Sequence, residues 1–223
     1  MGITLSLCQL HLEAAIVDLD GTLVDTVGDF EFALNAMLAD LGRPSVSRGF
    51  IERSVGKGSE HLIRATLAQV GADVSMFDPA WQRYQRHYLA INGRHSTLYP
   101  GVVEGLQGLH DAGLKLACLT NKPTAFARPL LALKCLDHFF SAVFGGDAFE
   151  RRKPDPLPLL RTCAALGTPP ARTLMIGDSR NDAEAGQAAG CPVVLVTYGY
   201  NHGEPVRAVP ALAHIERLDA LID

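Results

Sequence analysis

Five short apolar runs, separated along most of the chain by helix-length segments, constrain the fold of this sequence more than any other feature. They span residues 14–19, 114–119, 141–144, 173–176 and 193–196. Each run is nearly continuous rather than alternating, which is typical of strands that are covered on both faces. Strands that alternate with helices in this order predict an α/β fold with a doubly wound, Rossmann-like parallel sheet.

The region after the first apolar run breaks this alternation, because it contains helical patterns and no convincing strand. Helices are expected at residues 27–41, 58–70 and 80–91. Thr26 and Asp29 resemble a capping box at the start of the first helix. About 65 residues of helix is too long for a simple crossover between strands. We therefore predict a small helical cap domain, residues 25–95, inserted into an α/β core formed by residues 1–24 and 96–223.

Composition and charge exclude several classes of function. The chain has 20 Lys and Arg against 24 Asp and Glu, and no basic run could follow a phosphate backbone, so nucleic acid is not an expected partner. No apolar run approaches the roughly 18 residues of a membrane-spanning helix, and the N-terminus lacks the basic start of a signal peptide. Five cysteines without a CxxC pair indicate reduced thiols in a cytoplasmic protein, rather than disulfides or a zinc site.

The strongest chemical signal is Asp18-Leu19-Asp20-Gly21-Thr22, at the end of the first predicted strand. Because side chains alternate along a strand, Asp18 and Asp20 can face the same pocket, at the sheet edge where α/β folds bind ligands. Two carboxylates this close need a cation or a proton between them, and both suit catalysis. The alternative is a helix-capping Asp followed by a turn Asp.

A second acidic group, Gly177-Asp178-Ser179-Arg180-Asn181-Asp182, follows another predicted strand. Asp178 falls at the strand end, and Asp182 lies one helical turn further on. Oxygen ligands from separate strand ends are what Mg²⁺ prefers. The alternative, in which Asp178 or Ser179 caps the helix and Asp182 favours its dipole, is compatible with metal binding.

Two further strand ends supply hydrogen-bonding and positive groups. Leu119-Thr120-Asn121-Lys122 offers a hydroxyl and an amide able to hold a phosphoryl oxygen. Lys153 lies in Arg151-Arg152-Lys153-Pro154, where the proline could aim it inward. Spacing does not decide which of the three basic residues points inward, and a solvated Lys153 is the alternative.

These four motifs, in this order, resemble those of the haloacid dehalogenase-like superfamily, and the helical insertion resembles its cap. Within the superfamily, the sequence is similar to phosphoglycolate phosphatases. That similarity is carried by residues 54–58, 99–102, 120–123, 145–147, 151–154 and 197–205. The chain departs from the pattern at Lys57, where bacterial relatives often have Asn.

The resemblance implies a Mg²⁺-dependent phosphomonoester hydrolase that acts through an aspartyl phosphate, with 2-phosphoglycolate as the expected substrate. Asp18 would be the nucleophile and Asp20 the general acid and base. Thr120, Asn121 and Lys153 would bind and neutralise the phosphoryl group. The implied metal ligands are Asp18, the carbonyl of Asp20, Asp178 and, directly or through water, Asp182.

Substrate choice is expected to lie in the cap, because the core motifs address only the phosphate. We expect the loop of residues 53–58 to approach the leaving group, with Lys57 or Arg53 near a carboxylate; a solvated basic loop is the alternative. The expected partner is a small phosphorylated metabolite, and the protein is expected to be a monomer or homodimer.

Other activities of the same family stay open. A phosphatase acting on pyrophosphate or an amino-sugar phosphate would use the same motifs, and a phosphohexomutase would use the same cap. A dehalogenase would have no need for Asp20, because its leaving group takes no proton. The non-enzyme alternative is a binding protein that kept the fold and lost activity, although every motif residue is present.

Overall fold

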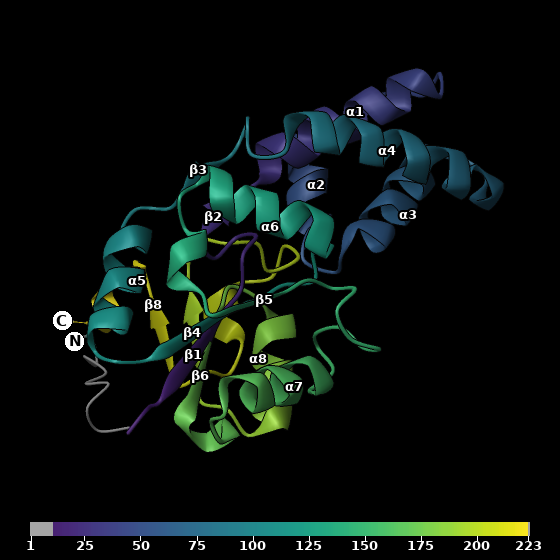
Figure 1. Cartoon of the computed structure of the whole chain (residues 1–223). Helices are drawn as coiled ribbons and strands as arrows, with labels where there is room; N and C mark the ends of the chain where they lie inside the picture. Colours follow the sequence, from purple (N-terminus) through teal and green to yellow (C-terminus); the bar gives the residue numbers. More distant parts are fainter. Residues whose placement is uncertain (1–10, 223) are drawn as a thin grey trace.

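The computed structural model describes residues 11–222 and contains a six-stranded sheet flanked by helices (Figure 1). The strand order is β5-β4-β1-β6-β7-β8, and every pairing is parallel. The strands are Ala14–Val17 (β1), Lys115–Leu119 (β4), Ala142–Phe144 (β5), Thr173–Gly177 (β6), Val193–Val196 (β7) and Ala213–Ile215 (β8). This architecture confirms the predicted doubly wound α/β fold.

The apolar strands are covered on both faces, as their composition predicts. The helices that cover them are Val102–Asp111 (α5), Thr124–Leu133 (α6), Leu157–Leu166 (α7) and Arg180–Ala189 (α8). In β1, Ala15 and Val17 belong to a hydrophobic cluster with α5 and α6, whereas Ala14 and Ile16 belong to a second cluster with α7 and α8. Alternate residues of one strand thus enter two different cores.

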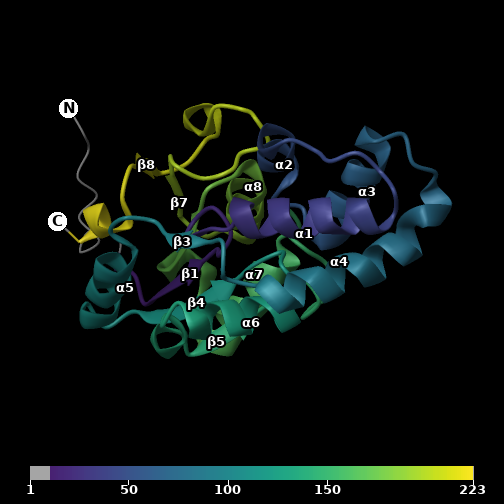
Figure 2. The same ribbon diagram turned by 90° about the horizontal axis from the view of Figure 1, so that it is seen from above.

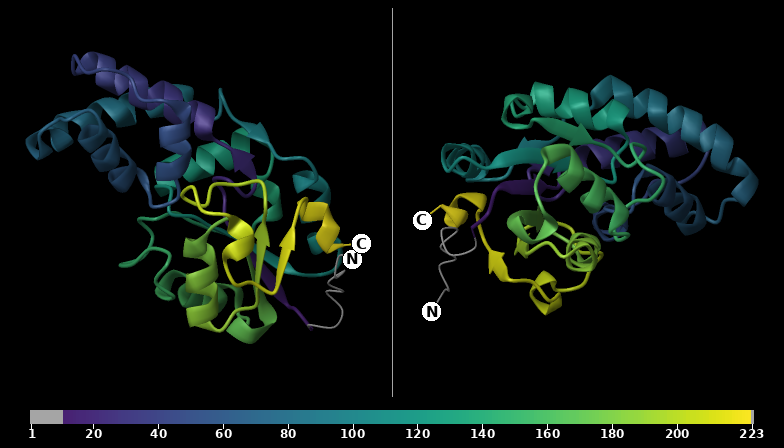
Figure 3. Two further views of the ribbon diagram at one scale, coloured as in Figure 1. Left: turned by 180° about the vertical axis from the view of Figure 1, so that it is seen from behind. Right: turned by 60° about the horizontal axis from the view of Figure 1, so that its bottom comes forward.

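The remaining helices form a separate unit that projects beyond the sheet (Figures 2 and 3). They are Val27–Asp40 (α1), Arg48–Ser54 (α2), Ser59–Gln69 (α3) and Phe77–Ile91 (α4). Their own hydrophobic cluster includes the fully buried Leu34, Ile63 and Tyr84. A short antiparallel ladder of Val24–Asp25 (β2) and Thr97–Leu98 (β3) joins the two ends of this unit. The domain boundaries at residues 25 and 95 stay a prediction.

The predicted capping box at the start of α1 is wrong. The Thr26 side chain makes no capping hydrogen bond, and the Asp29 carboxylate instead accepts from the backbone N–H groups of Gly93 and His95, each at 2.8 Å. The backbone N–H groups of Thr26 and Val27 donate to Tyr200 Oη, at 3.1 and 3.2 Å. A side chain from the loop after β7 therefore caps the first cap helix.

Helix α2, strand β8 and the β2–β3 ladder were not predicted. The expectation of no signal peptide, together with Cys8, lies outside the described residues. Across residues 11–222, no helix has the length and apolar character needed to cross a membrane.

Candidate active site

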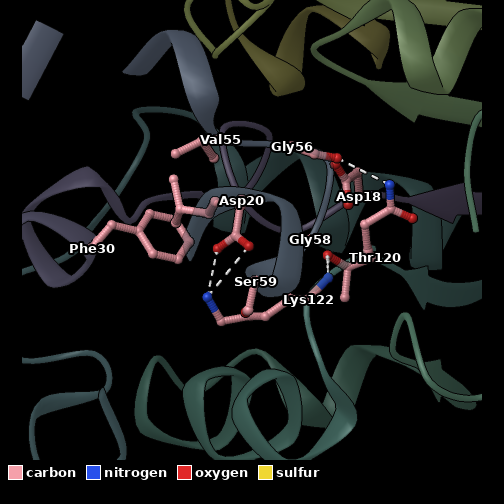
Figure 4. A pocket seen from close by; sticks show the side chains of 11 residues that line it. Asp18, Asp20, Phe30, Val55, Gly56, Gly58, Ser59, Thr120 and Lys122 are labelled. Atoms are coloured by element: carbon pink, nitrogen blue, oxygen red, sulfur yellow. Dashed lines mark hydrogen bonds and ion pairs between the residues drawn. The ribbon is translucent and has the colours of Figure 1, made fainter. Parts of the chain in front are cut away.

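The carboxyl ends of β1 and β4 meet the cap at a small pocket (Figure 4). Its lining residues are Asp18, Asp20, Phe30, Val55, Gly56, Gly58, Ser59, Leu62, Thr120, Asn121 and Lys122. Asp18 and Asp20 both line it, as their alternation along the chain predicts. The cavity volume is about 20 Å³, which is enough for about one ordered water. The cap therefore closes over the motif residues in this conformation.

Lys153 lies inside the site, against two of the motif carboxylates. Its Nζ atom is 3.0 Å from Asp18 Oδ1 and 2.7 Å from Asp182 Oδ1, and it donates to the carbonyl of Leu119 at 2.9 Å. The ammonium pairs with both carboxylates, and its hydrogen bonds go to Asp182 Oδ1 and to the Leu119 carbonyl. The neighbouring Arg151 and Arg152 are exposed. The inward-pointing residue of this basic turn is therefore Lys153, and the solvated alternative does not hold.

Asp178 is held at the carboxyl end of β6 by a close approach of the first motif. Its Oδ1 atom accepts from Thr22 Oγ1 at 3.2 Å, and Oδ2 accepts from the backbone N–H of Tyr200. A Cβ atom on Gly21 would lie 2.1 Å from Asp178 Oδ2, and Gly21 has a φ of +86°. Both the space and the backbone conformation therefore require glycine after Asp20.

Asp182 is fully engaged by the protein. Its Oδ2 atom accepts from the backbone N–H of Ser179 at 3.1 Å and from Ser179 Oγ at 2.7 Å, while Oδ1 contacts Lys153. Asp182 thus caps its own helix, α8, and also anchors the lysine. The same carboxylate therefore caps a helix with one oxygen and contacts the site lysine with the other.

The carboxylate oxygens of Asp18, Asp178 and Asp182 lie within 4.8 Å of one another and can hold a metal ion. Burial raises the pKa of Asp18 to about 7, against the opposing effect of Lys153, and burial together with the charge of Asp182 raises the pKa of Asp178 well above its ordinary value. The four motif aspartates and two lysines are all buried, so with every aspartate ionised the site would carry an excess of two negative charges. A divalent cation would neutralise that excess, and carboxylate oxygens are its preferred ligands.

Lys122 is a residue of the pocket that was not predicted to belong to the site. Its Nζ atom lies 3.0 Å from Asp20 Oδ1 and 4.5 Å from the centre of the Phe30 ring (Figure 4). The same atom donates to Tyr88 Oη at 2.6 Å. The side chain is 1% exposed. The sequence places Lys122 beside Thr120, but its partners lie 102 and 34 positions away, so no local pattern reveals the contact.

Thr120 and Asn121, the predicted phosphoryl-binding residues, both line the pocket. Thr120 Oγ1 accepts from the backbone N–H of Lys122 at 3.2 Å, which leaves its hydroxyl hydrogen to donate. Asn121 Nδ2 donates to the carbonyl of Lys153 at 2.9 Å, and Oδ1 accepts from the backbone N–H of Lys153 at 3.1 Å. The Asn121 amide therefore holds the Lys153 backbone in place.

The cap loop is held to the core through one carbonyl. The carbonyl oxygen of Gly56 accepts from Asn121 Nδ2 at 3.0 Å and from Asn181 Nδ2 at 3.1 Å. By contrast, Arg53 and Lys57 are exposed and do not line the pocket. The structure thus brings the backbone of the predicted cap loop to the site, but neither of its two basic side chains.

Comparisons with known proteins agree with this geometry. A family model described as "Haloacid dehalogenase-like hydrolase" matches residues 15–196. The chain is 44% identical over 213 residues to a phosphoglycolate phosphatase of Thiobacillus denitrificans, covering 92% of this chain and 94% of that protein. It is 42% identical over 215 residues to the protein named "Phosphoglycolate phosphatase, plasmid" of Cupriavidus necator, covering 96% and 93%.

A solved structure is also similar. The crystal structure described as a predicted phosphoglycolate phosphatase from Haemophilus somnus superposes with a TM-score of 0.91 at 31% identity, covering 95% of this chain and 97% of that one. The family model and the relatives span both the sheet and the inserted helices, so the resemblance drawn from the four motifs is confirmed. The chain belongs to the haloacid dehalogenase-like hydrolase family.

Proposed function

We propose that this protein is a Mg²⁺-dependent phosphomonoester hydrolase that converts 2-phosphoglycolate to glycolate and phosphate. The observation that carries the proposal is the arrangement of the two carboxylates in one closed pocket. Asp18 lies beside Lys153, and Asp20 lies beside Lys122. The names of the relatives support the choice of substrate.

In the first step, a carboxylate oxygen of Asp18 attacks phosphorus and forms an aspartyl phosphate, while the bond to the leaving oxygen breaks. The ammonium of Lys153, 3.0 Å from Asp18 Oδ1, neutralises charge on the transferring group. The hydroxyl of Thr120 donates to a phosphoryl oxygen. Positioning and charge neutralisation supply most of the catalysis of phosphoryl transfer.

Asp20 transfers a proton in each of the two steps. Its carboxyl group protonates the leaving alkoxide as the aspartyl phosphate forms, and its carboxylate then takes a proton from the water that hydrolyses this intermediate. Asp20 lines the pocket beside the cap residues Phe30 and Ser59. The leaving group therefore occupies the cap side of the pocket.

The acidic cluster would hold Mg²⁺ through Asp18, Asp178 and the backbone carbonyl of Asp20. Asp182 would complete the site directly or through a water molecule, while its carboxylate also holds Lys153 and caps α8. When bound, the ion neutralises phosphoryl charge and orients the phosphate against Asp18.

The size of the closed pocket favours a small leaving group. A cavity of about 20 Å³ beside Asp20 is lined on its cap side by Phe30, Val55 and Leu62. Every substrate therefore requires these side chains to move away from Asp20, and a hexose or amino sugar requires a larger movement than glycolate does. This observation favours 2-phosphoglycolate over sugar phosphates and over a phosphohexomutase reaction.

The test is a panel of substrates assayed with purified protein, with and without Mg²⁺, by release of inorganic phosphate. The panel contains 2-phosphoglycolate, pyrophosphate, glucose 1-phosphate and glucosamine 6-phosphate. We expect kcat/KM for 2-phosphoglycolate to exceed that of each other substrate at least about tenfold. Absence of Mg²⁺-dependent release from every substrate would refute the hydrolase, and a preference for another substrate would refute the choice of 2-phosphoglycolate.

The covalent route is tested by Asp18→Asn, which removes the nucleophile at nearly constant volume. We expect no turnover together with an unchanged circular dichroism spectrum. The matched control is Asp78→Asn, the same change at an exposed position of the cap helix α4, which should retain full activity. Turnover by the Asp18→Asn protein would contradict the aspartyl-phosphate step.

We further propose that the enzyme acts in the cytoplasm as a monomer or homodimer. A small diffusible metabolite and cysteines without a disulfide framework are consistent with that compartment. Light scattering on the eluted peak of a size-exclusion column determines the number of subunits.

A further inference from the structure

A 2-phosphoglycolate molecule carries two anionic ends, and two buried lysines stand beside the motif aspartates. Lys153 stands on the Asp18 side, where the phosphoryl group is transferred. On the Asp20 side, within residues 11–222, the cationic side chain that lines the pocket is Lys122. Arg53 and Lys57, the basic residues of the cap loop, are exposed and stand outside it.

The position of Lys122 matches the covalent structure of the leaving group. In 2-phosphoglycolate a single methylene separates the ester oxygen from the carboxylate carbon. A group that protonates the ester oxygen and a group that binds the carboxylate must therefore be close neighbours. Lys122 Nζ lies 3.0 Å from Oδ1 of Asp20, the proposed acid, and the two side chains point toward one another (Figure 4).

Lys122 is held at the cavity by two side chains. Its ammonium donates to both oxygens of Asp20, at 3.0 and 3.3 Å, and to Tyr88 Oη at 2.6 Å. Of the two buried lysines near the motif aspartates, Lys122 is the one that lines the cavity.

The surroundings of Lys122 would strengthen its contact with an anion. Its ammonium lies 4.5 Å from the Phe30 ring centre and 4.7 Å from the Tyr88 ring centre, and its side chain is 1% exposed. A charge in such a place is poorly screened by water, so an opposite charge beside it is bound more strongly than at the surface.

We propose that Lys122 binds the carboxylate of the leaving group and so determines the specificity of the enzyme for an acidic alcohol. This inference rests on the proposed function, because it presupposes a phosphate ester at Asp18. It moves the choice of substrate from the cap loop to a core residue that follows β4. Phe30 and Tyr88 of the cap complete the site around the same ammonium.

The test compares two substrates that differ in the group that Lys122 would bind. One is 2-phosphoglycolate, and the other is 2-hydroxyethyl phosphate, in which a hydroxymethyl group replaces the carboxylate. The measured quantity is the ratio of the two kcat/KM values, which is independent of the fraction of folded protein. We expect Lys122→Met to lower this ratio at least about 30-fold, chiefly through kcat/KM for 2-phosphoglycolate. Lys122→Arg, which keeps the charge, should restore part of it.

The matched control is Lys115→Met, which changes an exposed lysine at the opposite end of β4 and should leave the ratio unchanged. An unchanged ratio in Lys122→Met would overturn the proposal, since both substrates would then lose activity equally through Asp20. If the wild-type protein prefers 2-hydroxyethyl phosphate, the proposed function fails instead.

A binding measurement covers the case in which Lys122→Met has no turnover. The probes are 3-phosphonopropionate and 3-hydroxypropylphosphonate, which cannot be hydrolysed and differ in the same end group, measured by titration calorimetry. Selective loss of 3-phosphonopropionate binding supports the assignment. Equal affinity for this probe in wild-type and variant proteins overturns it.

Discussion

Replacing Tyr200 by Phe tests how a core loop fixes the first cap helix. Tyr200 Oη accepts from the backbone N–H groups of Thr26 and Val27, and it donates to Asp25 Oδ1. The phenylalanine ring fills the same space, so the change removes hydrogen bonds and little packing. Tyr200 is 8% exposed, and water does not easily replace the lost oxygen.

The magnitude follows from which groups lose their partners. The N–H of Val27 retains Asp25 Oδ1 as an acceptor at 3.2 Å, so Thr26 is the one left with an orphaned backbone donor. A buried unsatisfied donor costs about 1–3 kcal/mol, and losing a helix N-cap costs about 1 kcal/mol. We therefore expect the free energy of unfolding to fall by about 2 kcal/mol, which lowers Tm by about 4–8 °C in a chain of this size.

The measurement is thermal and urea unfolding followed by circular dichroism, with kcat/KM recorded on the same samples. The control is Tyr198→Phe, two residues away, which removes one hydrogen bond to the carbonyl of Thr22 and should cost no more than about 1 kcal/mol. If Tyr200→Phe changes stability by less than the control does, Tyr200 is not the cap of α1.

Three further outcomes are expected. Gly21→Ala should lower kcat/KM more than about 100-fold, because its Cβ would lie 2.1 Å from Asp178 Oδ2 at a φ of +86°; a phosphate-release assay shows this, and near-normal activity would contradict the packing argument. Mg²⁺ at 100 times its Kd should stabilise the wild type by about 2.7 kcal/mol and raise Tm by about 5–10 °C. Asp178→Asn should abolish that thermal shift in a melting experiment, and a persisting shift would place the ion elsewhere. Asn181→Ala removes one of the two side-chain donors to the Gly56 carbonyl, a bond expected to contribute about 1 kcal/mol. Proteolytic cleavage of the cap loop should therefore become about 3- to 10-fold faster, and an unchanged cleavage rate would contradict a stabilising role for this bond.

Much of the fold could be predicted from the sequence because its strands lie in the middle of a covered sheet. β1 and β6 read as continuous apolar runs, since neighbouring side chains enter the two cores on opposite faces. Strand β8 has three residues, one of them histidine, and lies at the edge of the sheet, so it leaves no such run. The β2–β3 ladder has two residues on each side and joins segments more than 70 positions apart. Its pairing depends on the path of the whole cap.

The candidate site likewise contains residues that could be predicted from the sequence and residues that could not. Asp18 and Asp178 were predicted because each lies at the end of an apolar run, and parallel strands bring their carboxyl ends together. Lys153 was assigned through the family resemblance, because spacing alone did not decide which of three basic residues points inward. Lys122 and Tyr200 were not predicted as site residues, because their roles depend on partners that the cap and a long loop carry to them. Thr26 offered a local capping pattern that the structure does not use, because a tertiary contact from Tyr200 occupies the same N–H groups.

The departure at Lys57 from the family pattern bears less on the substrate than its place in the cap loop suggests. The Lys57 side chain is exposed, whereas Gly56 and Gly58 on either side line the pocket. The loop therefore contributes backbone to the site, and the Gly56 carbonyl is fixed by the amides of Asn121 and Asn181. Because a side chain at position 57 points away from the reacting groups, exchanging Asn for Lys there leaves the lining of the pocket unchanged. Under the proposed role of Lys122, the positive charge that faces the leaving group comes from the core, and the cap contributes the apolar side chains of Phe30, Val55 and Leu62 to the pocket.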